Sequence, residues 1–266
     1  MKKDVYEILA LVRKQKPVVH HLTNWVTIYD CANVVKVFGA SPVMAHAQEE
    51  VEEMAGIASA LVLNIGTLTV DFIEAMKLAA KAANKKGIPV VLDVCGAGAT
   101  SLRDKKILEL LELVKIDIIK GNASEIARVS GLNIKTKGVD SSDVEQDLVE
   151  IAKNLAKQRK CTVVITGKED IITNGAKTYF VKNGHSMMAN IVGTGCMAAS
   201  VIGTFAAVEK DLVFAAASGL ICYEIAAELA QKVSYGPGTF KEKLFDEIFA
   251  LNKEKIDKMQ KISVID

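Results

Sequence analysis

A cysteine follows two glycines at the predicted start of a helix. Residues 193–196 read Gly-Thr-Gly-Cys, and a long apolar run follows them. Glycines at a helix start let a ligand approach successive backbone N–H groups, which together with the helix dipole stabilise negative charge. In that field the Cys196 thiol should ionise more readily than a free thiol of pKa ~8.5, so that it can accept a proton from a substrate hydroxyl. An isolated cysteine is more often a small buried hydrophobe, but beside Gly193 and Gly195 we favour the functional interpretation.

Three further polar residues stand at the carboxyl ends of predicted buried strands: Asp93, Lys120 and Thr166. In doubly wound sheets ligands bind at this edge, because the loops there open into a crevice and helix amino termini point at it. Lys120 could neutralise a phosphate, or its charge could simply reach out of the strand end. Thr166 offers a hydroxyl at the same edge, although a threonine there needs no functional explanation.

The loop after Asp93 is built from small residues, Gly96 to Thr100, whose backbone amides could approach an anion. A strand-terminal aspartate in a glycine turn explains the same residues equally well. The sequence contains neither the Walker pattern GxxxxGK[ST] nor the dinucleotide fingerprint GxGxxG.

Asn122 and Glu125 have the spacing Asn-x-x-Glu directly after the Lys120 strand. This spacing could place two oxygen ligands near a hydrated magnesium ion bound to phosphates. The same pattern is a helix capping box, which is the better interpretation of the motif by itself.

The amino-terminal third holds a short polar cluster made of His20, His21, Thr23, Asn24 and Thr27. The stretch 39–50 is predicted as a loop before a helix, with Pro42, Met44 and His46 in the loop. Met44 there could shape an apolar ligand pocket rather than pack in the core. We discount a zinc site made of the histidines, because adjacent histidines at strand period point to opposite faces and no cysteine ligand is close in sequence.

Four apolar runs without alternation predict buried strands of a parallel sheet: Ala60–Ile65, Ile88–Asp93, Ile116–Lys120 and Cys161–Thr166. An alanine-rich helix over 71–87, stopped by Gly87, makes a crossover between the first two. Asn174-Gly175 predicts a hairpin of two brief antiparallel strands after Thr166.

Helices are predicted at both ends of the chain. The first 16 residues predict a soluble helix, and Met197–Lys232 a helical, strongly apolar region with a break near 209–211. A last amphipathic helix is predicted from about Thr239 to Gln260, after a Gly-Pro-Gly turn. The stretch 130–143 is predicted as a polar surface connection, so residues 1–266 are expected to form a single domain.

The composition points to a small substrate. The chain has 266 residues, half of them hydrophobic, and a net charge of +1, which indicates no nucleic-acid partner. Its five cysteines are an odd number without any CxxC, so we expect reduced thiols and a cytoplasmic protein. The longest apolar stretches are shorter than the ~20 residues that span a bilayer, so no membrane partner is expected.

Several runs together resemble the hydroxyethylthiazole kinases of the ribokinase-like superfamily. The resemblance extends in order from about Val18 to the GPGTF segment at 236–240, and the pair GASPVMAHAxEE and GTGC makes it specific. The matching runs are HLTNWVTIYDCANVVKVFGASPVMAHAQEEVEEMAGIASALVLNIGTL, VVLDVCGAGAT, KGNASEI, VVITGKEDIITNG and VGTGCMAA.

The resemblance implies an α/β fold, a ribokinase-like three-layer α-β-α arrangement with a mostly parallel central sheet and an antiparallel edge. It implies a thiamin-salvage enzyme that uses ATP and Mg²⁺ to phosphorylate the alcohol of 4-methyl-5-(2-hydroxyethyl)thiazole. A homotrimer with sites between subunits is implied as well.

The same resemblance implies a role for individual residues. Asn24 and Met44 of one subunit, and Gly193 and Cys196 of another, would border the thiazole. Lys120, Thr166 and Gly195 would contact ATP, while Asp93 and Glu125 would organise magnesium and phosphates. Cys196 would be the proton acceptor, in the place of an aspartate in most of the superfamily.

One departure from the family concerns the loop after Asp93, where Val94-Cys95 replace the usual Pro-Val and remove a φ restraint. Two other functions stay open within the fold: a kinase of another small alcohol, such as a sugar or a pyrimidine, and a non-catalytic nucleotide sensor. A thiol-dependent acyl transferase built on Cys196 lacks a convincing partner base.

Overall fold

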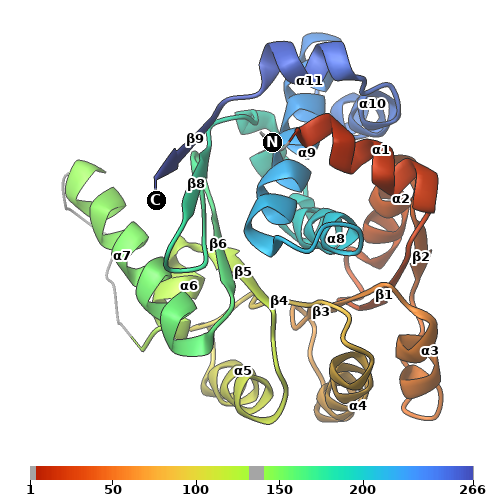
Figure 1. The fold of residues 1–266 in the computed structure, drawn as a ribbon, viewed down its shortest axis with the longest axis vertical. Helices are drawn as coiled ribbons and strands as arrows, with labels where there is room; N and C mark the ends of the chain where they lie inside the picture. The colour runs from red at the N-terminus through yellow and green to blue at the C-terminus, as the bar shows by residue number, and fades with distance from the viewer. Residues whose placement is uncertain (1–3, 132–140, 266) are drawn as a thin grey trace.

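One nine-stranded sheet organises the residues that the computed structural model describes, 4–131 and 141–265 (Figure 1). The strand order is β2-β1-β3-β4-β5-β6-β7-β8-β9. The strands from β2 to β6 are parallel, and β7, β8 and β9 are antiparallel. The strands are β1 (Val18–Leu22), β2 (Ser41–Val43), β3 (Ala60–Asn64), β4 (Val90–Asp93), β5 (Ile118–Asn122), β6 (Thr162–Thr166), β7 (Asp170–Thr173), β8 (Thr178–Val181) and β9 (Ile262–Ile265).

Helices cover both faces of the sheet, so the three-layer α-β-α arrangement is confirmed (Figure 1). Successive side chains of a strand point to opposite faces of the sheet, so they pack in two separate cores. In β3, Val62 packs in one core, and Leu61 and Leu63 pack in the other. One face packs on α3 (Val51–Ile57), α4 (Val70–Lys86), α5 (Ser101–Leu113), α6 (Ala123–Val129) and α7 (Ser141–Arg159). The other packs on α1 (Val5–Gln15), α2 (Ile28–Phe38), α8 (Thr194–Ala206), α9 (Leu212–Lys232), α10 (Pro237–Phe249) and α11 (Lys253–Met259).

The four predicted parallel strands correspond to β3, β4, β5 and β6, and the predicted hairpin to β7 and β8. The crossover helix is α4, and Gly87 ends it in the left-handed conformation with φ 78°. The amino-terminal helix is α1, and the predicted break in the apolar helical region separates α8 from α9.

The helix α9 is long and apolar enough to cross a membrane by length and composition. However, 83% of its most apolar stretch is buried inside the structure. It packs against α8 and α10 and fills the core on one side of the sheet, as the core helix of a soluble protein does.

Three sequence predictions were wrong. The predicted helix from Thr239 to Gln260 is two helices, α10 and α11, because the Asn252 side chain accepts a hydrogen bond from Lys255 N and starts a second helix. The chain then adds β9 to the sheet edge, where a helical end was expected. Pro42 lies in the edge strand β2 rather than in a loop, and an edge strand tolerates proline because one side of its backbone is unpaired.

The strand β1 was not predicted from the polar cluster at 20–27, yet it lies between β2 and β3 in the sheet. Most of the predicted connection 130–143 lies outside the described residues.

Candidate active site

The helix α8 begins at Gly193 beside the turn that follows β1. Gly193 has φ 96°, and a Cβ on it would lie 2.5 Å from Thr27 Cγ2, so only glycine fits this helix start. The first N–H groups of a helix have no partner within it, and here they open toward the carboxyl edge of the sheet. The local structure predicted at 193–196 is therefore present, and tertiary contact with Thr27 explains the first glycine.

Cys196 lies in the first turn of α8, and its sulfur accepts a hydrogen bond from Asn24 Nδ2 at 3.3 Å. A hydrogen bond from the Cys95 thiol is the main cause that lowers the pKa of Cys196 to about 5, against the opposing effect of burial. Thr27 and the positive charge of Lys120 contribute in the same direction. Cys196 is therefore a thiolate at neutral pH. Cys95, whose own pKa is raised, stays protonated and donates its S–H in the hydrogen bond to Cys196.

A chain of buried amides connects Cys196 to the central strands. Asn24 Nδ2 donates to Asn64 Oδ1 at 2.9 Å, and Asn64 Nδ2 donates to Asp93 Oδ2 at 2.7 Å. Lys120 Nζ lies 3.3 Å from Asp93 Oδ1 on the next strand. The sheet register explains the contacts, since Asn64 is paired with Asp93 and Asp93 with Lys120 at the ends of β3, β4 and β5.

The ion pair of Asp93 and Lys120 is fully buried. Burial raises the pKa of Asp93 to about 7, although the charge of Lys120 opposes the rise. Burial by itself would lower the pKa of Lys120, but the charges of Asp93 and Glu125 raise it. The charge of Lys120 thus only partly offsets the free-energy cost of burying the ionised Asp93 carboxylate. A further cation beside Asp93 would favour its ionised form.

Lys120 also faces the start of α8. A Cβ on Gly195 would lie 3.3 Å from Lys120 Nζ, so the ammonium group approaches the helix backbone closely. An ammonium group and the positive end of a helix dipole repel each other unless an anion lies between them. Their approach makes this edge of the sheet a site for a negatively charged group.

Asn122 and Glu125 form the capping box that the sequence favoured. Asn122 Oδ1 accepts from Glu125 N at 2.9 Å, and Glu125 Oε2 accepts from Asn122 N at 2.8 Å. The second oxygen of Glu125 accepts from Gly96 N at 2.8 Å and so fixes the loop that follows Asp93. Each carboxylate oxygen keeps further lone pairs, so capping does not prevent Glu125 from meeting water around a metal ion.

Thr166 and Gly195 line the same cavity, which has a volume of about 730 Å³. The cavity lies between the ends of β6, β7 and β8 and the helices α8 and α9. Its volume falls within the range of small-molecule sites. The structure thus brings these two residues to a space that borders both Lys120 and the start of α8.

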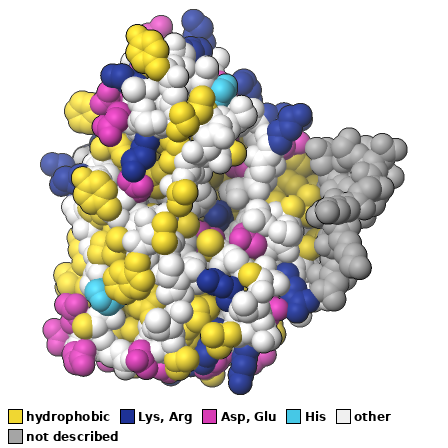
Figure 2. All heavy atoms as spheres, turned by 180° about the vertical axis from the view of Figure 1, so that it is seen from behind, with side chains coloured by type: hydrophobic (Ala, Val, Ile, Leu, Met, Phe, Trp, Pro, Cys, Tyr) yellow, Lys and Arg dark blue, Asp and Glu magenta, His cyan; other side chains and the backbone are white. Residues whose placement is uncertain are grey.

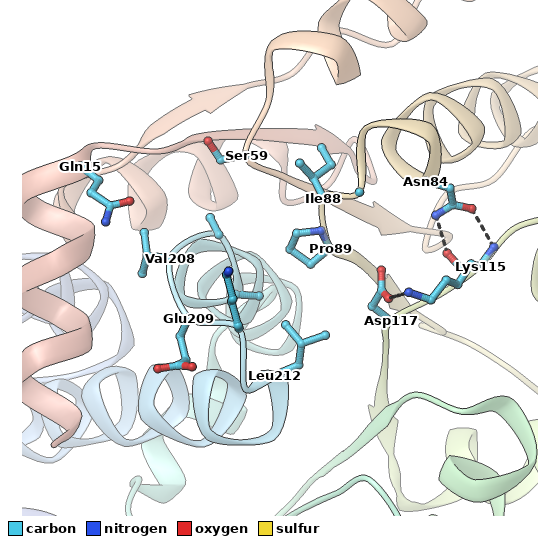
Figure 3. A pocket seen from close by; sticks show the side chains of 14 residues that line it. Gln15, Ser59, Asn84, Ile88, Pro89, Lys115, Asp117, Val208, Glu209 and Leu212 are labelled. Atoms are coloured by element: carbon cyan, nitrogen blue, oxygen red, sulfur yellow. Dashed lines mark hydrogen bonds and ion pairs between the residues drawn. The ribbon is translucent and has the colours of Figure 1, made fainter. Parts of the chain in front are cut away.

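A second cavity, of about 550 Å³, lies at the amino ends of the central strands (Figure 3). Asn84 bonds to the backbone of Lys115, and Lys115 Nζ pairs with Asp117 at 2.6 Å, so its polar side chains bond to one another. Cys196, Asp93 and Lys120 are at the other end of the strands, and we place the candidate site there.

The structure brings together two residues that the resemblance assigned to different subunits. Asn24 touches Cys196 of its own chain, so the expectation that these two residues come from different subunits is wrong. The turn after β1 carries Asn24 directly to the start of α8, which the sequence could not reveal. Met44 follows the edge strand β2 and is half-buried against the core.

Sequence reasoning missed Asn64 and the contact of Cys95 with Cys196. Asn64 stands at the carboxyl end of a predicted strand, as Asp93 does, so the same rule could have found it. No sequence signal joins Cys95 to Cys196, because 100 residues separate two thiols that meet only in the fold.

A family model described as the hydroxyethylthiazole kinase family matches residues 9–254. A hydroxyethylthiazole kinase of Methanosarcina mazei is 56% identical, over 96% of this chain and 97% of its own length. One from Thermoanaerobacter pseudethanolicus is 49% identical, over 96% and 98%. The solved structure of a hydroxyethylthiazole kinase from Pyrococcus horikoshii OT3 has a TM-score of 0.91 at 38% identity, over 98% of this chain and 99% of that one.

A ribokinase-like superfamily protein of Enterococcus faecalis shares the fold alone, with a TM-score of 0.63 at 14% identity over 90% of this chain and 93% of that one. Its likeness agrees with the ribokinase-like layers described above. Because the family model covers most of the chain and the relatives align over nearly its full length, this chain belongs to the hydroxyethylthiazole kinase family and is a kinase.

Proposed function

We propose that this chain transfers the γ-phosphate of ATP to the alcohol of 4-methyl-5-(2-hydroxyethyl)thiazole in thiamin salvage. The observation that carries the proposal is the position of Cys196 in the first turn of α8, where it is hydrogen-bonded to Asn24 and where Lys120 approaches the helix start. A base and an anion site side by side are what transfer of a phosphoryl group to an alcohol requires.

Cys196 accepts the proton of the substrate hydroxyl as the oxygen attacks the γ-phosphorus, and ADP leaves. Negative charge on the transferring group is met by the N–H groups at the start of α8, from Gly193 onward, and by Lys120. Phosphoryl transfer has a loose transition state with late proton loss, so orientation and charge stabilisation supply most of the rate.

ATP occupies the cavity of about 730 Å³, with Thr166 and Gly195 in its wall. This position brings the phosphate end of the nucleotide to Lys120 and the start of α8. The side of the cavity lined by the exposed Lys168 and Lys182 is left for the nucleoside.

Asp93 and Glu125 would hold Mg²⁺ through water and phosphate oxygens. The buried Asp93 carboxylate favours a further cation, and magnesium is commonly held by one or two carboxylates together with substrate phosphates. Bound there, the ion would supply charge neutralisation at the phosphates. Gly96 N and Asn122 N orient the Glu125 carboxylate in advance.

The working unit is a cytoplasmic homotrimer of single kinase domains that span residues 1–266, with Met44 of a neighbouring subunit completing the thiazole pocket. Apolar side chains beside the site support association: Trp25 is 49% exposed, Tyr29 76% and Val192 72%. Val192 precedes Gly193, which abuts Thr27, so the three belong to adjoining segments. In the view of Figure 2, hydrophobic side chains are most frequent on the left and lower part of the surface.

The test is ADP release by the purified protein with Mg-ATP and hydroxyethylthiazole, beside sugars, pyrimidines and no acceptor. Release that depends on the thiazole is expected. Release with another alcohol alone would reassign the substrate, and no release with any acceptor would favour a nucleotide-binding protein without catalysis.

A further inference from the structure

Two buried carboxyl groups stand together in the wall of the 730 Å³ cavity. Asp170 begins β7 and is 2% exposed, and Glu224 lies in α9 and is 7% exposed. The two side chains are within hydrogen-bonding reach of each other. Neither residue has a part in the phosphoryl transfer described above.

One oxygen of each carboxyl, Asp170 Oδ2 and Glu224 Oε2, is closed to solvent and has no donor among the described residues. No water or ligand reaches these two atoms without movement of the protein. Two ionised carboxylates in contact would repel each other and also carry the cost of burial. A single proton between them gives both oxygens a partner.

The charged groups around the pair do not replace that proton. Lys120 and Glu169 act on Asp170, with opposite signs, and Glu228 adds negative charge beside Glu224. The other ionisable groups in the cavity wall are Lys168, Lys182 and His185. Burial is the main cause that raises the pKa of both carboxyls, and for Glu224 the charge of Asp170 raises it further.

The pair also joins two segments of the cavity wall. Asp170 Oδ1 accepts from Gly167 N at 2.9 Å, which holds the turn after Thr166. On the other side Glu224 packs against Gly184, where a Cβ would lie 3.5 Å from Glu224 Cδ. Loss of the contact between the carboxyls would therefore loosen the start of β7, with its Gly167 turn, from α9.

We propose that Asp170 and Glu224 share one proton that holds the two walls of this cavity at the spacing that ATP requires. The pair is a positioning device and touches no reacting atom. The proposal rests on the proposed function, which assigns ATP to this cavity. When the proton is lost at alkaline pH, the carboxylates separate, and the KM for ATP rises while kcat at saturating ATP changes little.

The test is the pH dependence of the KM for ATP and of kcat, from neutral to alkaline pH, in the full chain and in E224Q. The Gln amide donates to Asp170 at every pH, so E224Q should keep the neutral KM and lose its alkaline rise. E224A leaves Asp170 Oδ2 without a donor and should raise the KM for ATP about tenfold at all pH values. E112Q is the control, because Glu112 is an exposed carboxyl of α5 on the other face of the sheet, and it should follow the wild type.

A KM for ATP that is flat in the wild type, or an alkaline rise that E224Q retains, would overturn the proposal. Unfolding without nucleotide provides a separate measurement. Because the folded-state pKa of Glu224 is raised, the folded protein binds more protons, and stability should fall as pH rises above the usual glutamate range. If E224Q removes that fall but no variant turns over ATP, the shared proton stands and the assignment of ATP to this cavity is overturned.

Discussion

Cys196 combines a low pKa with a position in the first turn of α8, close to Lys120. A thiolate with a pKa of about 5 is ionised at neutral pH but holds a proton weakly. In a loose transition state the substrate oxygen needs to lose little of its proton before the new bond is well formed. A weak base at the right position is therefore sufficient. The residue's environment, with Asn24 and Cys95 as donors, therefore matters more than its intrinsic basicity.

Replacement of the thiolate tests its role directly. We expect Cys196→Ala to lower kcat by about 100-fold or more, the usual contribution of a general base, and to leave ATP affinity nearly unchanged. Cys196→Asp should retain or raise turnover, because a carboxylate accepts the same proton. Fluorescence of the single tryptophan, Trp25, next to Asn24, offers a binding measurement beside the kinetics. Equal turnover of the alanine variant and the wild type would refute the assignment.

Cys95 controls the acid side of the pH profile. Without its thiol hydrogen bond the pKa of Cys196 rises, so Cys95→Ala should lose kcat/KM at a higher pH than the wild type does. A hydrogen bond to a charged group is worth about 1.5–3 kcal/mol, which corresponds to a displacement of about one pH unit or more. Cys95→Ser keeps a donor and serves as the control. Superimposable profiles for the alanine variant and the wild type would contradict the role.

At the scale of elements, α8 joins the core to the site. Its amino end forms the anion site, and its middle packs directly on the sheet, where a Cβ on Gly203 would overlap Val62 Cγ2 of β3. The close approach at Gly203 sets the depth of the helix over the sheet and therefore the position of Cys196. Packing of one glycine thus contributes to geometry in the active site two turns away.

We expect Gly203→Ala to destabilise the protein by about 1–3 kcal/mol, as overpacking of a filled core does. Gly56→Ala is the matched control, since Gly56 lies in α3 with open space around its Cα, and alanine there should stabilise by about 0.5–1 kcal/mol. Urea unfolding measures both values. Equal changes in the free energy of unfolding of the two variants would mean that α8 is not tightly packed against β3 at Gly203.

At the scale of the whole molecule, the site draws on five separate segments of the chain: the turn after β1, the ends of β3, β4 and β5, and the start of α8. They meet because parallel strands bring their carboxyl ends to one edge. The exposed Trp25, Tyr29 and Val192 border this edge, and burial of apolar side chains of this size would support a stable interface.

We expect the purified protein to have three times its chain mass of 28.6 kDa in sedimentation equilibrium. Tyr29→Glu should dissociate it and lower turnover with the thiazole, because a charge would be buried without a partner and Met44 of the neighbour would be lost. Leu113→Glu, on the half-exposed end of α5 across the sheet, is the control and should leave the trimer intact. A monomeric wild type that turns over the thiazole fully would refute the proposed assembly.

Much of the framework could be read from local pattern. Unbroken apolar runs predicted the parallel strands, Gly87 the end of α4, and Asn174-Gly175 the hairpin. The prediction failed where local signals were weak or overridden: β1 runs into a polar stretch at His20 and His21, and β9 is a short edge strand that pairs with β8.

The sequence by itself determined which residues stand at strand ends and helix starts, because those positions follow from periodicity, glycines and caps. It therefore indicated Asp93, Lys120, Thr166 and the stretch from Gly193 to Cys196. Tertiary structure alone decided which side chains lie together in the site. It placed Asn64 against Asp93, Asn24 and Cys95 against Cys196, and Asp170 against Glu224. The physical reason is that register and packing, which join residues far apart in the chain, leave no local pattern in sequence.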